Sequence, residues 1–322
     1  MNIADPELNV GNMSKIKYFY KYLGLKSDGN VRADFLENGL FRFTQPDQLN
    51  DPFEVRPRVL MEYSNEDIQR ARERALEAGF PKENLEKFLP LFLKTMPRRM
   101  TVEEFPGLTY PKRPGTEERF QSLEEMDKHD ATARLQEVYK HINETYGILS
   151  LTTSRNNLVM WSHYADSHKG IVVGFTVSHP YFFNSKDFHA VEYKAERISL
   201  SSNDGYLRLA GKDLPTGSDF RDLADQLFLR KDPDWRYEKE WRMIKRLDKA
   251  STSLAGGSVC LFEIPPDAIK ILILGAQISQ PSREKIISLI VSSKKWTHVQ
   301  IFQASLSDSR FGLEFKKIKK GP

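Results

Sequence analysis

The feature of this sequence that most limits its fold is a series of short runs rich in β-branched and aromatic residues, each bounded by turn residues. Such runs predict buried or half-buried strands. The runs cover residues 15–23, 40–46, 148–154, 171–177, 259–264, 270–275 and 298–304. The longest apolar stretches, 269–274 and 286–291, are far shorter than the roughly 20 residues that cross a bilayer. We therefore expect a strand-rich protein that does not span a membrane.

The segment 64–146 has a different pattern, with apolar residues at the spacing of one helix face. Leu135, Val138 and Ile142 continue this spacing and predict a helix that ends at Gly147. Other helices are expected over residues 34–38, closed by Gly39, over 158–169, closed by Gly170, and from Pro281 onward.

Together these patterns predict the α+β class, with a mixed, mainly antiparallel β core, flanking helices and a helical insertion. The expected organisation is a single domain over residues 15–318 with its insertion at 64–146. A flexible N-terminus at 1–14 and a basic tail at 319–322 are expected on either side, and the basic stretch 314–322 is expected to fray.

Composition limits the cellular setting and the class of partner. The 48 Lys and Arg residues against 44 Asp and Glu residues give a net charge of +4, which permits a nucleic-acid partner without requiring one. The one cysteine, Cys260, excludes an internal disulfide and a multi-cysteine metal site, and this fits a reducing compartment. The first residues lack the basic start and apolar segment of a secretory signal, so we expect a cytoplasmic protein.

Two glutamates stand two positions apart in the stretch WRYEKEWR. If residues 235–244 form a strand, its alternation places Glu238, Glu240 and Arg242 on one face. Such a pair can keep one carboxylate ionised to bind a ribose hydroxyl or to stabilise a cationic sugar, while the other orients a nucleophile. If Glu240 is catalytic, its removal is expected to lower the rate by several orders of magnitude with little effect on folding, because a glutamate on an exposed strand face adds little to stability. The alternative is a solvated strand face of Glu–Arg pairs.

Hydroxyl, aromatic and basic side chains supply candidate ligand contacts. Thr152, Thr153 and Ser154 end a predicted strand, where they can hold a ribose or an amide, although Ser154 can equally cap a helix. Lys21 and Arg42 stand among aromatic residues and can bind a phosphate or a ribose. These aromatic residues can stack a nicotinamide, an adenine or a base, or can belong to the core: Tyr18, Phe19, Tyr20, Tyr22, Phe41 and Phe43.

The NDPFE stretch predicts a rigid loop with a fixed carboxylate. Asn50 and Asp51 before Pro52 favour an Asx-type turn, which presents Glu54 in one direction. Loops of this kind are also common as purely structural elements.

The MWSHYADSHKG stretch offers three further candidate contacts, Trp161, His163 and Tyr164. His163 and Asp166 can form an oriented histidine, or His163 can be a structural residue beside Trp161. Motifs for zinc proteases, P-loop nucleotide hydrolases, Rossmann dehydrogenases and α/β-hydrolases are absent from the sequence, so these classes lose most of their support.

Several blocks in this order resemble a bacterial family catalogued as domain of unknown function 2971. The blocks are KYFYKYL, FRFTQPDQLNDPFE, MWSHYADSHKGIVVGF, KDPDWRYEKEWR and AIKILILG. The resemblance covers most of residues 15–305 outside the helical insertion. The family implies a fold and no reaction.

A remoter resemblance concerns the order of a basic and aromatic first strand, a strand with hydroxyls and a strand with E-x-E. This order looks like the layout of mono-ADP-ribosyltransferases. The resemblance implies that NAD is the substrate and that Glu240 grips a nicotinamide-ribose hydroxyl and stabilises the cationic sugar. It further implies that Glu238 positions the acceptor, that Thr152, Thr153 or Ser154 holds the carboxylate or the ribose, and that no metal is needed.

Three functions remain open at this point. The first is an NAD-consuming transferase with a protein or nucleic-acid acceptor, for which a toxin or antiphage-defence role is expected because NAD loss harms a host. The second is a metal-dependent nuclease in which Asp51, Glu54, Glu238 and Glu240 converge on Mg²⁺. The third is a non-catalytic module whose aromatic groove binds a nucleotide or a peptide.

Overall fold

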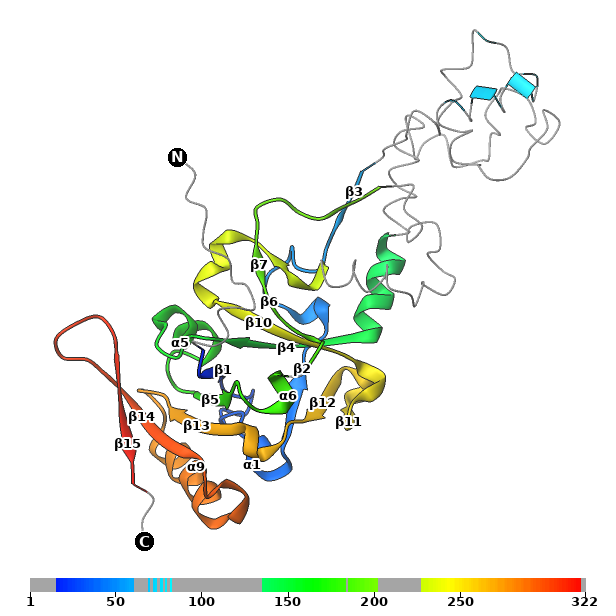
Figure 1. The fold of residues 1–322 in the computed structure, drawn as a ribbon. Coiled ribbons are helices and arrows are strands. Elements are labelled where there is room, and N and C mark those ends of the chain that lie inside the picture. The colour runs from blue at the N-terminus through cyan, green and yellow to red at the C-terminus, as the bar shows by residue number, and fades with distance from the viewer. Residues whose placement is uncertain are drawn as a thin grey trace. The chain divides into compact units, whose positions relative to one another are not determined.

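The computed structural model describes residues 16–60, 69, 72–73, 76–77, 79, 82, 135–183, 185–201 and 227–319 (Figure 1). The chain divides into two compact units. The first is drawn from Met1–Val55, Asn143–Glu196 and Phe228–Pro322, and the second from Arg56–Ile142 and Arg197–Leu227. Most of the predicted insertion at 64–146 and all of residues 1–14 lie outside the described residues. The predicted domain organisation therefore stays a prediction.

The first unit contains an eight-stranded sheet. Its order is β15-β14-β13-β5-β1-β4-β10-β6, and every neighbouring pair is antiparallel except β13 and β14. The strands are β1 (Tyr18–Leu23), β4 (Tyr146–Thr152), β5 (Ile171–Thr176), β6 (Phe188–Ala190), β10 (Glu240–Arg246), β13 (Ile269–Leu274), β14 (Gln300–Leu306) and β15 (Leu313–Ile318). The sheet and the helices around it confirm the predicted α+β class with a mainly antiparallel core.

Shorter strands complete the described structure. In the first unit, β2 (Leu40–Phe43), β12 (Val259–Glu263) and β11 (Thr252–Leu254) form a three-stranded sheet, and β7 (Glu192–Tyr193) pairs in parallel with β9 (Arg230–Lys231). In the second unit, β3 (Arg58–Leu60) pairs in parallel with β8 (Ser199–Ser201). Each of the seven runs that were predicted to form strands overlaps a strand of the structure, although the bounds of several differ by one to three residues.

The helices follow the capping signals in the sequence. The α-helices are α1 (Phe35–Asn38), α5 (Leu158–Tyr164), α6 (Pro180–Phe183) and α9 (Gln280–Ser292). The 3-10 helices are η2 (Pro46–Gln48), η4 (Pro233–Glu238), η5 (Leu247–Lys249), η6 (Ala255–Gly257), η7 (Pro266–Ala268) and η8 (Lys294–Trp296). Gly39 closes α1 with a φ of 77°, and the Asn157 side chain accepts a hydrogen bond from the Met160 amide at the start of α5. Residues 135–145 are helical with Val138 and Ile142 buried, as predicted.

The helix predicted over residues 158–169 ends earlier than expected. Positive φ values of 46°, 53° and 67° at Asp166, Ser167 and His168 are incompatible with a right-handed helix. Gly170 has a different role from helix termination, because a Cβ at this position would lie 2.1 Å from the Leu23 carbonyl oxygen. The glycine therefore permits the close approach of this turn to β1.

The strand predicted over residues 235–244 is wrong in its first half. The Asp232 side chain accepts a hydrogen bond from the Asp234 amide, and Pro233 begins η4. Lys239 then takes a left-handed conformation with a φ of 47°, and β10 begins at Glu240. Glu238 and Glu240 therefore do not share one strand.

The predicted fraying of residues 314–322 is also wrong for its first part. β15 pairs antiparallel with β14 along its whole length, and Leu313 is buried. The fraying was predicted from the basic composition of this segment, but hydrogen bonds to β14 hold its backbone as a strand. Residues 320–322 lie outside the described residues.

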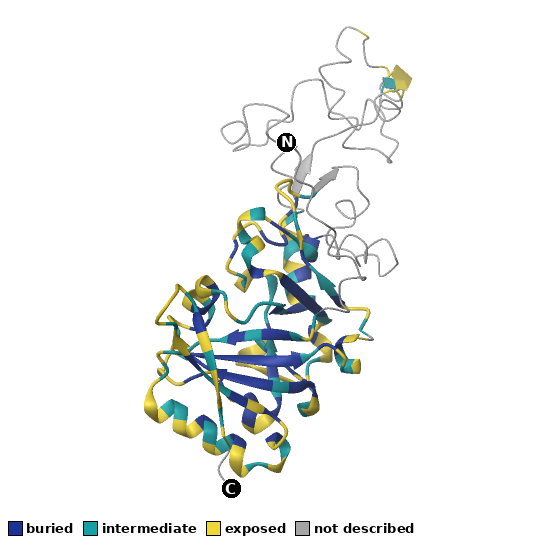
Figure 2. Cartoon of the chain, turned by 60° about the vertical axis from the view of Figure 1, so that its left-hand side comes forward, coloured by how far each residue is buried: buried dark blue, intermediate teal, exposed yellow. Residues whose placement is uncertain are grey.

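The central strands of the large sheet are covered on both faces, as the dark strands in Figure 2 show, whereas most residues of the edge strand β15 are exposed or half-buried. Phe19 of β1 packs in one core, whereas the neighbouring Tyr20 and Tyr22 pack in a second core on the opposite face. Because both faces are covered, Glu240 and Arg242 of β10 are buried as well.

The middle of the sheet separates at one place. β1 pairs with β5 at six positions but meets β4 only at Tyr20 and Thr152. Farther along β4, Ile148 pairs with Thr44 instead. Buried carbonyl groups that lose a strand partner need another donor, so this separation is a natural place for polar side chains.

Candidate active site

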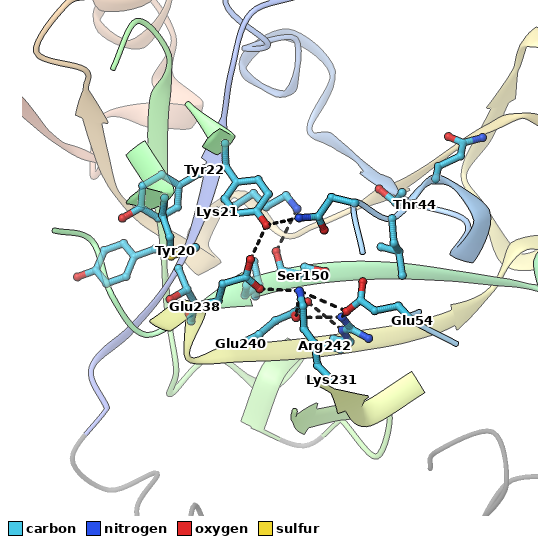
Figure 3. Close-up of a pocket in the computed structure, with 17 residues that line it drawn as sticks. Tyr20, Lys21, Tyr22, Thr44, Glu54, Ser150, Lys231, Glu238, Glu240 and Arg242 are labelled. Atoms are coloured by element: carbon cyan, nitrogen blue, oxygen red, sulfur yellow. Dashed lines mark hydrogen bonds and ion pairs between the residues drawn. The ribbon is translucent and has the colours of Figure 1, made fainter. Parts of the chain in front are cut away.

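A pocket of about 220 Å³ lies where β1 and β4 separate (Figure 3). β1, β4, β10 and α5 line it together with residues of the 44–54 segment. Its described walls are Tyr20, Lys21, Tyr22, Thr44, Gln48, Leu49, Asn50, Glu54, Ser150, Leu151, Thr152, Met160, Tyr164, Lys231, Glu238, Glu240 and Arg242.

Three carboxylates in this pocket converge on two cations, as Figure 3 shows. Lys231 Nζ lies 2.6 Å from Glu238 Oε2, 3.2 Å from Glu240 Oε2 and 3.2 Å from Glu54 Oε1. Arg242 also pairs with Glu54. All five side chains are at most 5% exposed. We call these five residues the charge cluster.

Arg242 holds Glu240 by two hydrogen bonds, from Nε to Oε1 at 2.8 Å and from Nη2 to Oε2 at 2.9 Å. Burial alone would raise the pKa of Glu240, but Arg242 and Lys231 outweigh it and lower that pKa to about 2. Glu240 and Glu54 in turn raise the pKa of Arg242 against the effect of its own burial. Glu240 is therefore ionised throughout the neutral range.

Glu238 has different surroundings from Glu240. Burial raises the pKa of Glu238, Lys231 opposes this shift, and the charge of Glu240 adds to it. The Tyr164 hydroxyl donates a hydrogen bond to Glu238 Oε1, and Asn50 Nδ2 donates one to the Tyr164 hydroxyl oxygen at 2.7 Å. A carboxylate with a raised pKa is suited to exchange protons near neutral pH.

The backbone places both glutamates in the pocket although they belong to different elements. Thr152 Oγ1 donates to the Glu238 carbonyl oxygen at 2.5 Å, and Thr152 pairs with Glu240 across the β4–β10 ladder. The Tyr193 hydroxyl oxygen accepts the Glu240 amide hydrogen at 2.8 Å. Thr152 therefore positions the carboxylates, and its hydroxyl already has a backbone partner.

Lys21 stands on the opposite wall, where β1 leaves β4. Its Nζ donates to the Ser150 carbonyl oxygen at 3.0 Å. Burial lowers the pKa of Lys21 to about 8, although Glu240 and Glu238 partly oppose this shift. Lys21 therefore loses its charge near pH 8, well below the range of an ordinary lysine.

The structure brings many of the predicted site residues to the pocket. The predicted residues that line it are Lys21, Tyr22, Asn50, Glu54, Thr152, Tyr164, Glu238, Glu240 and Arg242. The alternative of a solvated Glu–Arg face is wrong, because Glu238, Glu240 and Arg242 are buried. The premise that Glu240 stands on an exposed strand face, from which a small effect on folding was expected, is therefore wrong.

The other predicted site residues lie elsewhere in the described part of the chain. The Arg42 guanidinium donates to Gln48 and to the Ser258 carbonyl oxygen, and Trp161 is a core residue in contact with Tyr22. His163 is exposed. Three more predicted residues do not line the pocket: Asp51, whose Oδ1 accepts the Phe53 amide hydrogen, Thr153, and Ser154, whose hydroxyl bonds to Asn156.

Lys231 is the main site residue that the sequence interpretation missed. It precedes the E-x-E pair by seven residues and comes from β9, a strand of two residues. β9 pairs with β7, so the same small pairing supplies Lys231 and the Tyr193 hydroxyl that holds Glu240. The local sequence shows only a lysine at the start of KDPDW. That this lysine pairs with the three glutamates depends on the fold.

The carboxylate arrangement expected for a magnesium nuclease does not form. Asp51 does not line the pocket. The three glutamates that line it are each paired with a cation, either Lys231 or Arg242. Across the described ranges, no cluster of three or more His, Cys, Asp and Glu side chains has the arrangement of a metal site. Within the same ranges, no helix has the length and apolar character needed to cross a bilayer.

Comparison with known proteins gives one match. Residues 160–243 match the family described as "Protein of unknown function (DUF2971)". This region contains Tyr164, Lys231, Glu238, Glu240 and Arg242, and it is narrower than the 15–305 expected from the sequence blocks. Neither the curated proteins nor the solved structures include a significant match to the chain.

Proposed function

We propose that the pocket is the active site of an enzyme that breaks the bond between nicotinamide and ribose in NAD, as an ADP-ribosyltransferase or an NAD glycohydrolase. One observation carries the proposal: of two buried glutamates in one pocket, Glu240 accepts two hydrogen bonds from Arg242, whereas Glu238 is bonded to the Tyr164 hydroxyl and to Lys231, and their pKa values shift in opposite directions. Two carboxylates whose pKa values differ in this way take different roles in acid–base chemistry.

The chemistry needs a fixed negative charge and a proton acceptor. When the C–N bond breaks, its electron pair leaves with nicotinamide and positive charge develops on the ribose. Glu240, kept ionised by Arg242, supplies negative charge that stabilises this transition state. Glu238 accepts the proton of the incoming hydroxyl or water that bonds to the ribose carbon.

Unused hydrogen-bonding capacity in the pocket supports a polar ligand. Glu54 Oε2 is buried without a hydrogen-bond partner among the described residues, so it can accept from a ligand hydroxyl or amide. Lys21 has donors beyond the one that it gives to Ser150. With Lys21 protonated, its charge and those of Lys231 and Arg242 balance the three glutamates, and the site becomes net negative when Lys21 is neutral.

The size of the cavity indicates which part of NAD it takes. A volume of about 220 Å³ is below the roughly 300–1,000 Å³ of pockets that enclose drug-sized ligands. We therefore propose that the nicotinamide-ribose end enters and that the adenosine end stays outside. An enzyme that consumes NAD would suit a toxin or an antiphage effector.

The direct test follows nicotinamide release from NAD by chromatography, with the full-length chain. We expect release by the wild type and a loss of about 10²- to 10⁴-fold in E238Q, the range for removing a general base. E263Q is the matched control, because Glu263 is an exposed glutamate of β12 outside the pocket. Absence of release by the wild type, or equal rates in E238Q and E263Q, would contradict the proposal.

A further inference from the structure

Lys21 differs from the two cations of the charge cluster in its partners. Lys231 is bonded to three carboxylates and Arg242 to two. In the part of the chain that the structure describes, Lys21 Nζ has one hydrogen-bond partner, the carbonyl oxygen of Ser150. An ammonium group has three donors, so this amine faces the pocket without a carboxylate bonded to it.

A carbonyl partner leaves the amine free to lose its proton. With a pKa of about 8, about 10% of Lys21 is neutral at pH 7, against about 0.04% of an ordinary lysine. The neutral form of a buried lysine is the nucleophile in Schiff-base chemistry. The nearby charges of Glu238 and Glu240 favour a cationic nitrogen, which includes a protonated imine.

We propose that Lys21 is a nucleophilic amine that captures the aldehyde carbon of a pocket ligand as an imine. The neutral Nζ adds to the carbonyl carbon, and the carbonyl oxygen takes up a proton. The resulting carbinolamine loses water as the C=N bond forms, and hydrolysis reverses both steps. The reaction needs no oxidant or reductant, because one water is released for each imine formed.

The ligand class that we assign is the open-chain aldehyde of a ribose 5-phosphate ester, such as ADP-ribose. This part of the inference rests on the proposed function, since hydrolysis of NAD frees the ribose carbon as a hemiacetal that opens to an aldehyde. The reactivity of the Lys21 amine itself does not depend on NAD cleavage.

The test traps the imine on the full-length protein at pH 7 with sodium cyanoborohydride, using propionaldehyde in one arm and ADP-ribose in another. Peptide mass mapping gives the rate of modification at each lysine. The internal references are the exposed Lys249 and Lys285, and Lys245, a half-buried lysine outside the pocket whose pKa burial also lowers. We expect Lys21 to react at least about tenfold faster than Lys249 and Lys285, and faster than Lys245, in both arms.

The outcomes separate the inference from the proposed function. Modification of Lys21 no faster than the references would overturn the inference, even if NAD releases nicotinamide. Fast reaction with propionaldehyde but none with ADP-ribose would overturn the assigned ligand class. Fast reaction in both arms without nicotinamide release would support the inference and contradict the proposed function alone. K21R should lose the fast modification while keeping the reference rates and the melting temperature.

Discussion

On the β10 side of the pocket, Arg242 bonds directly to Glu240 and Glu54, whereas on the α5 side Glu238 is bonded to the Tyr164 hydroxyl as well as to Lys231. The pKa of Glu240 falls to about 2 and that of Glu238 rises. Two carboxylates of one pocket thus differ because one is matched by a guanidinium and the other shares a single ammonium group. The β10 side is expected to maintain the fold, and the α5 side is expected to move protons.

Removal of Arg242 is expected to give the largest effect, and it tests whether the β10 side of the pocket maintains the fold. R242M leaves the buried Glu240 and Glu54 with Lys231 as the one cation paired with them among the described residues. Removing one partner of a buried ion pair destabilises a protein by about 3–5 kcal/mol. We expect a loss of this size in urea unfolding, and a change below about 1 kcal/mol would show that the β10 side does not hold the fold.

The next test compares the two glutamates directly. E240Q removes the charge that pairs with both Arg242 and Lys231, whereas among the described residues Lys231 is the one cation paired with the charge that E238Q removes. We expect E240Q to lower the free energy of unfolding more than E238Q, by about 1–3 kcal/mol, the cost of leaving a buried polar group without its partner. Equal losses in thermal or urea unfolding would remove the distinction between the two sides.

The pH dependence of stability sharpens the comparison further. The lowered pKa of Glu240 means that its stabilising effect is present above its ordinary value of 4.5 and is lost as the pH falls toward 2. The lowered pKa of Lys21 gives the same sign of pH dependence in a different pH range. Between pH 8 and 10.5 the unfolded state binds more protons at this lysine, so stability rises with pH there.

K21M isolates the second effect, because methionine keeps an unbranched side chain without the amine. The difference in unfolding free energy between wild type and K21M should change between pH 8 and 10.5, with the wild type gaining stability relative to the variant. Urea unfolding at several pH values measures it. A difference that stays constant across this range would contradict the lowered pKa of Lys21.

The smallest effect is expected from Y164F, which removes the hydroxyl that donates to Glu238. This hydrogen bond lowers the pKa of Glu238, so its loss should raise that pKa further. If Glu238 acts as a base, the acid limb of the pH–rate profile for nicotinamide release moves to higher pH, with a smaller loss at the optimum than in E238Q. An unshifted limb would exclude Tyr164 as a positioning residue.

Local patterns predicted much of the fold. Runs such as 171–177 and 270–275 became strands because β-branched residues bounded by turn residues favour that conformation. The secondary-structure predictions failed in two ways. Either a local helix signal was overlooked, or a strand formed because of pairing with a partner strand that the local sequence does not indicate. Asp232 and Pro233 started a 3-10 helix inside a predicted strand, and β15 formed from a basic segment because β14 was available to pair with it.

The sequence predicted the carboxylates of the site, but it did not predict all of the cations that pair with them. Glu238, Glu240 and Glu54 stand in distinctive local sequences, and the fold brings all three to one pocket. Their cation Lys231 reaches them through the pairing of β7 with β9, which no spacing along the chain indicates. Conversely, His163 and Arg42 have suitable chemistry but do not line the pocket: His163 is exposed, and Arg42 donates to Gln48 and to the Ser258 carbonyl oxygen.

The most direct test of the central claim is a crystal structure of E238Q soaked with NAD, because this variant should bind the substrate without consuming it. The proposal predicts electron density for the nicotinamide-ribose in the pocket between β1 and β4, with the ribose carbon that bears nicotinamide beside residue 238 and near Glu240. An empty pocket at saturating NAD, or the dinucleotide bound elsewhere on the protein, would contradict the proposal.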